Sequence, residues 1–489
     1  MCVFGHSIHK FSLFGLYFFI SYIFILSVYP GQSNMYWDSG WYWNFVTSVD
    51  FENYPRSFRG YLYPYIIYIL KTYSANIGLP TERLFILMNA AAVSMCTVYF
   101  MPEIICASKV QKNKYHDRMF VNGITTKRYF IGSAIFFICV LYFWQDYFVY
   151  PLSDFPALFC CAGTVFGLIR IDKILQSQEK INKMCVVGLI LLSLMTGAFA
   201  YATYNIRAIY LYGIVISIIL WMVRNRHKDC YVFIACFGIV LGGVLISYPQ
   251  MYVNKKYNDT YLPKVPTENY SNVDLQNMQL AWGLNFHRYE TYTGKDPVQG
   301  PQPGMGFYDK AGNILSAKEN ITGGVSLVQL AGLAVKYPLD LVGIYFRHLV
   351  NYLTIVWRQA YILDLHVNTI WVVLPCILLW LIFFYQICLF KCKEWIEWLQ
   401  NDAWTTVPFF AICLFMIPGA VEVRFFIAGY FIMYSFLSWR LDFGKIWNHF
   451  KSNTVSVSLI IFAVLGLWIS VIGDTLSSNG ISAVIFNYE

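Results

Sequence analysis

The chain has 489 residues, of which 58% are hydrophobic and only 13% charged, against about 25% charged residues in a typical soluble domain. A soluble protein this apolar could not cover its surface with polar side chains, and an aromatic content of 19% excludes a disordered chain. The net charge of +8 resides in short loops between apolar runs, with no basic stripe interleaved with exposed aromatic residues, so it does not indicate nucleic-acid binding. We therefore expect an integral membrane protein.

Apolar runs divide the chain into stretches that are long enough, or nearly so, to cross a bilayer core of about 30 Å. The eleven predicted spans are residues 11–29, 83–107, 129–149, 152–169, 184–204, 206–223, 230–249, 368–390, 404–420, 424–439 and 455–473. The ninth and tenth are short, so re-entrant segments are an alternative there. The expected fold is an all-α polytopic membrane protein with about eleven transmembrane helices, interfacial helices and a mixed outer loop region.

Basic residues between the spans predict the orientation. The short basic loops are residues 108–128, 170–183, 224–229, 391–402 and 440–454. Because short loops rich in Lys and Arg stay on the cytoplasmic side, we expect a cytoplasmic N-terminus. The first apolar run is long enough to span and has no small-residue cleavage site before Pro30, so we expect it to be retained.

Two long segments, residues 30–82 and 250–367, fall on the non-cytoplasmic side. The predicted division is an N-terminal transmembrane module over 1–249, a large outer segment over 250–367 and a C-terminal transmembrane module over 368–489. Within the outer segments we expect an interfacial helix at Tyr61–Leu70, an irregular Gly/Pro-rich loop around 295–313, and a helix lying along the membrane at 337–357.

Motifs of soluble enzymes and metal sites are missing from the sequence. There is no GxxxxGK[ST], no GxGxxG after a strand, no HExxH and no CxxC pair. The histidines of the outer segments, His287, His348 and His366, have no acid or Cys at metal-ligand spacing. No cofactor is therefore indicated, and a divalent metal stays an open alternative.

Ionisable residues gather at the outer ends of the spans, while the middles of the spans are nearly free of charge. The outer-boundary set is Arg83, Asp154, Arg207, Glu422 and Arg424. Charge in hydrocarbon is expensive and is usually functional, and transporters place such residues near the midplane instead. This distribution indicates a site where lipid headgroups meet the outer loops.

Asp38, within WDSGWYW of the first outer loop, is the candidate general base. Flanking aromatic bulk would partly desolvate its carboxylate, an environment that favours proton abstraction. The alternative is an ordinary solvated loop acid, and Asp50 and Glu52 are weaker competitors. Asp154, in YPLSDFPALF, is the second catalytic candidate, with helix N-capping beside Ser153 as an equal alternative.

Arginines of the outer boundary are candidates for holding a lipid-linked phosphate. Arg56 and Arg59 lie in PRSFRGY, Arg207 opens the sixth span and Arg424 opens the tenth. A guanidinium group binds phosphate in a planar, bidentate manner. For any single arginine, snorkelling to ordinary lipid headgroups is the simpler reading, and Glu422 is a plausible ion-pair partner of Arg424.

The order of these features resembles the GT-C superfamily of integral membrane glycosyltransferases, in particular bacterial enzymes related to aminoarabinose transferases and protein mannosyltransferases. The matching features are WDSGWY in the first outer loop, RGYLYP before an interfacial helix, PLSDFPALF at the fourth span, an Arg opening the sixth span and ExRFF near the late helices. The chain departs from the family's frequent paired acids, because Ser39 follows Asp38.

The resemblance implies a polyprenyl-phosphate sugar donor and transfer, with inversion, to a glycan, lipid or protein acceptor on the outer face of a bacterial plasma membrane. Asp38 would be the base, and Arg59, Arg207 and Arg424 would bind the donor phosphate. Membrane lipids are the other expected partners. The rivals are a polysaccharide polymerase of the O-antigen type, which does not need an acid in the first outer loop, and a lipid-linked sugar flippase or other transporter, which predicts midplane charges.

Overall fold

The structure is a computed structural model that describes residues 2–29, 37–44, 60–107, 120–121, 124–177, 183–262, 275–291, 305–321, 323–364 and 368–480. Its backbone contacts divide the chain into two compact units. Unit 1 comprises Met1–Val265, Phe390–Ile412 and Ala428–Arg440, and unit 2 comprises Pro266–Leu389, Cys413–Ile427 and Leu441–Glu489. The three consecutive domains expected from the sequence stay a prediction.

Unit 1 is built almost entirely from helices, with one short hairpin. Its elements are α1 (Cys2–Val28), α2 (Trp37–Asn44), α3 (Leu62–Ile77), α4 (Thr81–Met95), the π-helix η2 (Cys96–Phe100), α5 (Met101–Ile105), β1 (Phe120–Val121), β2 (Ile124–Thr125), α7 (Thr126–Trp144), α8 (Asp146–Val149), α9 (Asp154–Ser177), α10 (Lys183–Ile206), α11 (Tyr210–Arg224), the 3₁₀-helix η3 (Arg226–Lys228), α12 (Asp229–Asn258), α18 (Cys392–Asn401), most of α19 (Ala403–Met416) and α20 (Ile427–Trp439).

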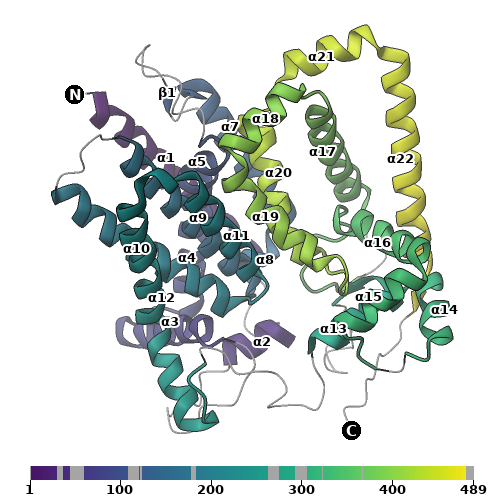
Figure 1. Cartoon of the computed structure of the whole chain (residues 1–489), viewed down its shortest axis with the longest axis horizontal. Helices are drawn as coiled ribbons and strands as arrows, with labels where there is room; N and C mark the ends of the chain where they lie inside the picture. Colours follow the sequence, from purple (N-terminus) through teal and green to yellow (C-terminus); the bar gives the residue numbers. More distant parts are fainter. Residues whose placement is uncertain are drawn as a thin grey trace. The chain divides into compact units, whose positions relative to one another are not determined.

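Helices α9, α10 and α12 lie side by side, and α2 and α3 lie across one end of the unit (Figure 1). Glycines let α10 and α12 approach closely. A Cβ at Gly197 would lie 1.9 Å from the carbonyl oxygen of Ile239, and one at Gly242 would lie 2.1 Å from that of Leu194. Small residues at such contacts are the usual means of packing helices in a membrane.

The chain is an all-α multi-pass membrane protein. Within the described residues, seven helices are long and apolar enough to span a membrane, and the pair α15–α16, bent by 116°, would make an eighth. The seven are His9–Val28, Thr81–Ile105, Thr126–Trp144, Lys183–Ile206, Cys230–Tyr257, Ile370–Cys388 and Thr454–Ser477. The other four predicted spans coincide with α9, α11, α19 and the stretch Val423–Trp439, the last three being shorter apolar helices. The count of eleven therefore stays a prediction.

Ion pairs join the loops that the sequence assigns to the cytoplasmic side. Glu103 of α5 contacts Lys10, Arg170 and Lys173, and Arg170 and Lys173 lie on α9. Arg224, at the end of α11, lies 3.4 Å from Asp172 and donates a hydrogen bond to the Gln400 carbonyl oxygen. Asp402 pairs with Arg440 at 2.6 Å. Four of the five loops, 170–183, 224–229, 391–402 and 440–454, therefore begin or end at one end of unit 1. The assignment of that end to the cytoplasm stays a prediction.

Unit 2 combines a small mixed region with further apolar helices. Its elements are α13 (Leu275–Asn285), β3 (Phe286–Glu290), β4 (Met305–Tyr308), α14 (Lys310–Lys318), α15 (Leu327–Lys336), α16 (Pro338–Tyr352), α17 (Ile370–Cys388), the 3₁₀-helix η6 (Val423–Phe426), α21 (Phe443–Ser452), α22 (Thr454–Ser477) and β5 (Asn479–Gly480). The three strands form an antiparallel sheet in the order β3-β4-β5.

Part of the outer segment expected to be irregular is folded. Residues 305–313 of that stretch form β4 and the start of α14, while 295–304 lie outside the described residues. The prediction of an irregular loop was wrong there, because the apolar side chains of this region have a core of their own. That core is formed by Leu280, Ala281, Leu284, Leu315, Val325, Leu333, Leu341 and Ile344.

Candidate functional site

Asp38 lies in the first turn of α2, where a carboxylate interacts favourably with the helix dipole. Ser39, Tyr42 and Trp43 of the same helix are buried, while Asp38 is half-buried. The buried side chains hold the helix against the protein. The role of Asp38 as a general base stays a prediction.

Contacts from α2 to α3 and α4 fix its position. The rings of Tyr42 and Tyr63 meet edge to face at 5.2 Å between centroids, and Trp43 meets Phe85 at 5.8 Å. The ammonium group of Lys71 donates a hydrogen bond to the Trp43 carbonyl oxygen and lies over its indole ring. Contacts of both the side chains and the backbone of α2 therefore hold the short helix that carries Asp38.

The start of α3 is joined in turn to the ends of α10 and α12. The Leu62 amide donates to Asn205 Oδ1 at 3.0 Å, and the Tyr61 amide donates to Gln250 Oε1 at 3.4 Å. Asn205 is completely buried and also donates to Gln250. Gly60 lies so close to Asn205 that a Cβ there would be 1.9 Å from its carbonyl oxygen. Arg59, the preceding residue, lies outside the described residues.

Arg207 follows two residues after Asn205 and forms an ion pair with Asp154 at the start of α9. The Asp154 side chain is 1% exposed and that of Arg207 is 17% exposed. The two residues were predicted to act separately, as a second catalytic acid and a phosphate ligand, and the structure brings them together. A guanidinium group has five N–H donors in a planar fork, a geometry that suits both carboxylate and phosphate groups.

Asp38, Asp154 and Arg207 thus lie at the same end of unit 1, opposite the end that carries Glu103. From Asp154 to Arg170 the helix α9 rises about 24 Å, which separates the two groups of charged residues. The connection runs from α2 through α3 to Asn205 and Arg207. Three segments that are distant in sequence therefore place candidate residues at the same end of unit 1.

Arg424, the remaining predicted phosphate ligand, belongs to unit 2. Its Nε donates to Glu422 Oε2 at 2.5 Å, which confirms the predicted ion pair. Arg288, buried at 1% exposure, donates to Glu290 at 2.6 Å, and the two pairs lie within electrostatic range of each other. Burial raises the pKa of Glu290 and the Arg288 guanidinium opposes that shift. Arg424 therefore lies in a charge-balanced set of two arginines and two glutamates.

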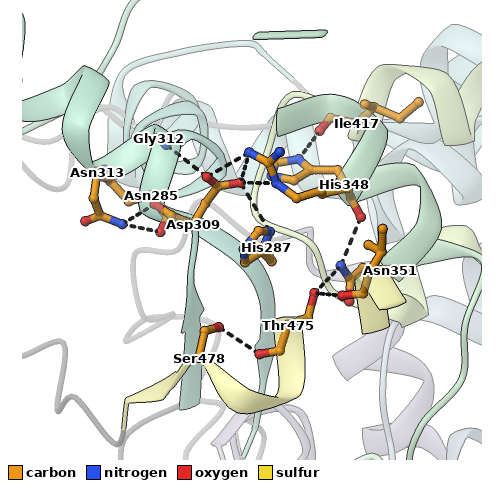
Figure 2. Close-up of polar contacts among 12 residues, drawn as sticks. Asn285, His287, Asp309, Gly312, Asn313, His348, Asn351, Ile417, Thr475 and Ser478 are labelled. Carbon is orange, nitrogen blue, oxygen red and sulfur yellow. Dashed lines mark hydrogen bonds and ion pairs between the residues drawn. The ribbon is translucent and has the colours of Figure 1, made fainter. Parts of the chain in front are cut away.

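Sequence reasoning missed a second polar cluster in unit 2, centred on Asp309 (Figure 2). The buried Asp309 carboxylate accepts the Gly312 amide at 2.9 Å, which caps α14, and two hydrogen bonds from Arg347 at 2.8 and 2.9 Å. His287 Nδ1 lies 3.2 Å from Asp309 Oδ2, without hydrogen-bond alignment. His287 and Asp309 are neighbours because of the strand register. Phe286, the residue before His287 on β3, pairs with Tyr308 on β4, the residue before Asp309.

Within the described residues, no three His, Cys, Asp or Glu side chains gather as a metal-binding group. Comparison of the chain with family models, with curated proteins and with solved structures finds no match in any of the three.

Proposed function

We propose that the protein is a membrane glycosyltransferase that moves a sugar from a polyprenyl-phosphate donor to a hydroxyl group of an envelope glycan, lipid or protein. The observation that supports this proposal is the gathering of Asp38, Asp154 and Arg207 at one end of unit 1. A carboxylate and a guanidinium group at the level of the membrane boundary suit the transfer of a sugar from a lipid phosphate.

In the proposed reaction, the Asp38 carboxylate accepts the proton of the acceptor hydroxyl as the hydroxyl oxygen attacks the anomeric carbon. The bond between that carbon and the donor phosphate oxygen breaks, polyprenyl phosphate leaves, and the anomeric configuration inverts. Arg207 stabilises the charge that develops on the phosphate. Asp154 holds Arg207, since its carboxylate is buried in the ion pair.

The further assignments follow the resemblance. Arg59 and Arg424 are the other residues that the resemblance proposes for binding the donor phosphate. The enzyme acts in a bacterial plasma membrane with its N-terminus in the cytoplasm. Transfer takes place on the outer face, at the end of unit 1 that carries Asp38.

The test is the variant Asp38→Asn, which preserves the size of the side chain but does not act as a carboxylate base. General-base catalysis typically contributes about a hundred- to ten-thousand-fold to rate, so turnover should collapse while the protein level stays normal. The assay is mass spectrometry of lipid-linked sugars and envelope glycans in a deletion strain that carries each variant. The strain with Asp38→Asn should accumulate donor and lack the modified glycan.

A matched control is Asp146→Asn in α8, the short helix between α7 and α9 that contacts α4. This acid lies at the same end of unit 1 and has no role in the proposed reaction, so the control should restore the glycan. Restoration by both variants would contradict the assignment of Asp38. Transport of the lipid-linked sugar without any transfer product would favour the flippase instead.

A further inference from the structure

The ion cluster of Glu103, Lys10, Arg170 and Lys173 has no role in the proposed reaction. The Glu103 carboxylate, 1% exposed, lies 2.5 Å from Arg170, 3.0 Å from Lys173 and 3.7 Å from Lys10. These cations come from α1 and α9 and meet a glutamate of α5. The cluster therefore joins three helices at the end of unit 1 away from Asp38.

The cluster carries more positive charge than its carboxylate neutralises. Three cations surround one glutamate, so the set has a net charge of +2. Within the described residues, the charges that act on Lys10 and Glu103 include no second carboxylate. In each of the neighbouring ion pairs at this end, Asp172 with Arg224 and Asp402 with Arg440, one carboxylate meets one arginine, so the charges balance.

The surplus charge faces outward beside lipid-facing surface. The side chains of Arg170 and Lys173 are 40% and 30% exposed, whereas that of Lys10 is 15% exposed. Phe11, the neighbour of Lys10 on α1, is 73% exposed, as expected of a side chain that contacts lipid. An anion that reaches Arg170 and Lys173 would thus lie at the boundary between the bilayer and water.

We propose that Arg170 and Lys173, supported by Lys10, bind the phosphate of an anionic phospholipid headgroup in the leaflet at this end of the protein. Glu103 holds the cations in place and leaves two positive charges for the ligand. Arg provides a planar fork and Lys a compact point charge, both of which suit phosphate. Basic sites between transmembrane helices on the cytoplasmic side are known to bind such headgroups.

Titration of the full-length protein in detergent, after removal of its lipid, tests the proposal. Native mass spectrometry follows the binding of phosphatidylglycerol and phosphatidylcholine, and thermal shift follows inorganic phosphate. Phosphatidylglycerol should bind and phosphatidylcholine should not. The double variant Arg170→Gln/Lys173→Gln should bind phosphatidylglycerol about thirtyfold more weakly, roughly fivefold for each cation removed.

The control Arg226→Gln/Lys228→Gln removes two positive charges from the same end of unit 1, in η3, and should leave binding unchanged. Because the test variant leaves a buried carboxylate with one cation, a second variant adds Glu103→Gln and should lose binding equally. Unchanged affinity in the test variants, or an equal loss in the control, would overturn the proposal. Inorganic phosphate binding as tightly as phosphatidylglycerol would make this a small-anion site and overturn the assignment to a lipid.

Discussion

His287 is buried beside two charged side chains of opposite sign, Asp309 and Arg347. Burial lowers the pKa of His287 below its usual value of 6.5; Asp309 opposes this shift, Arg347 adds to it and Asp474 opposes it. The unfolded chain therefore binds more protons than the folded protein just below pH 6.5. Stability should fall as the pH drops through that range, since the slope of stability against pH is positive wherever the unfolded state binds more protons.

The variant His287→Gln tests this linkage. It removes the titrating group, so its melting temperature should fall less between pH 7.5 and pH 5.5 than that of the wild type. Burial raises the pKa of Glu290, which gives a slope of opposite sign above its usual value of 4.5. Glu290 is present in both the wild type and His287→Gln, so its contribution cancels when the changes in melting temperature of the two proteins are compared. Parallel melting curves against pH would show that His287 does not titrate as argued.

At the scale of residues, the sequence predicts pairs that are close in the chain better than pairs that are distant. Glu422 and Arg424 are two residues apart, and their ion pair was predictable. The ion pair of Asp154 with Arg207 requires α9 and α10 to be antiparallel neighbours. The sequence therefore predicts that both residues lie at the outer boundary, but not that they pair with each other. His287 and Asp309 meet only through the register of β3 and β4, which no short-range pattern specifies.

At the scale of helices, the close approach of α10 and α12 depends on glycine. Gly197→Ala should destabilise the protein by about 1–3 kcal/mol, because its Cβ would lie 1.9 Å from the Ile239 carbonyl oxygen. Gly188, on the same helix, would place a Cβ in open space. Gly188→Ala should therefore keep or slightly raise the melting temperature measured in detergent, and equal melting of the two variants would contradict the argument.

The helices themselves were largely predictable, since long apolar runs identify spans by composition. The irregularities within and between these helices were less predictable. The π-helix Cys96–Phe100 lies inside a predicted span, and hydropathy does not register a change of helix type. The 116° bend between α15 and α16 does have a signal in the sequence, because Pro338 begins α16 and disfavours a helical conformation in the residue before it.

At the scale of the whole molecule, the orientation is open to a direct test in a cysteine-free background. Gly323, in the outer segment, is exposed and a Cβ there meets no neighbour. Gly323→Cys should react with an impermeant maleimide in whole cells. Arg226→Cys, in an exposed predicted inner loop, should react only after lysis. The reverse pattern would invert the topology and move Asp38 to the cytoplasmic side.

The division into units was not predictable from the sequence. Residues 390–412 and 428–440 return to unit 1, whereas 413–427 between them belong to unit 2. Such an alternation depends on long-range packing, for example the hydrogen bond from Thr405 to the Ile104 carbonyl oxygen. Hydropathy and charge describe each segment separately, so they specify spans and sides but not partners.

The last strand of the sheet in unit 2 is made long after the other two. β5 pairs Asn479 with Phe307 and Gly480 with Gly306. About 170 residues separate β4 from β5, a stretch that takes roughly 10 to 30 seconds to synthesise at typical rates of translation. During that interval the edge of β4 that pairs with β5 has no other partner strand among the described residues, and α22 must emerge before β5 can form. The sheet therefore cannot be completed until α22 has been synthesised, so we expect the pairing of β5 with β4 to be a late step in the folding of unit 2.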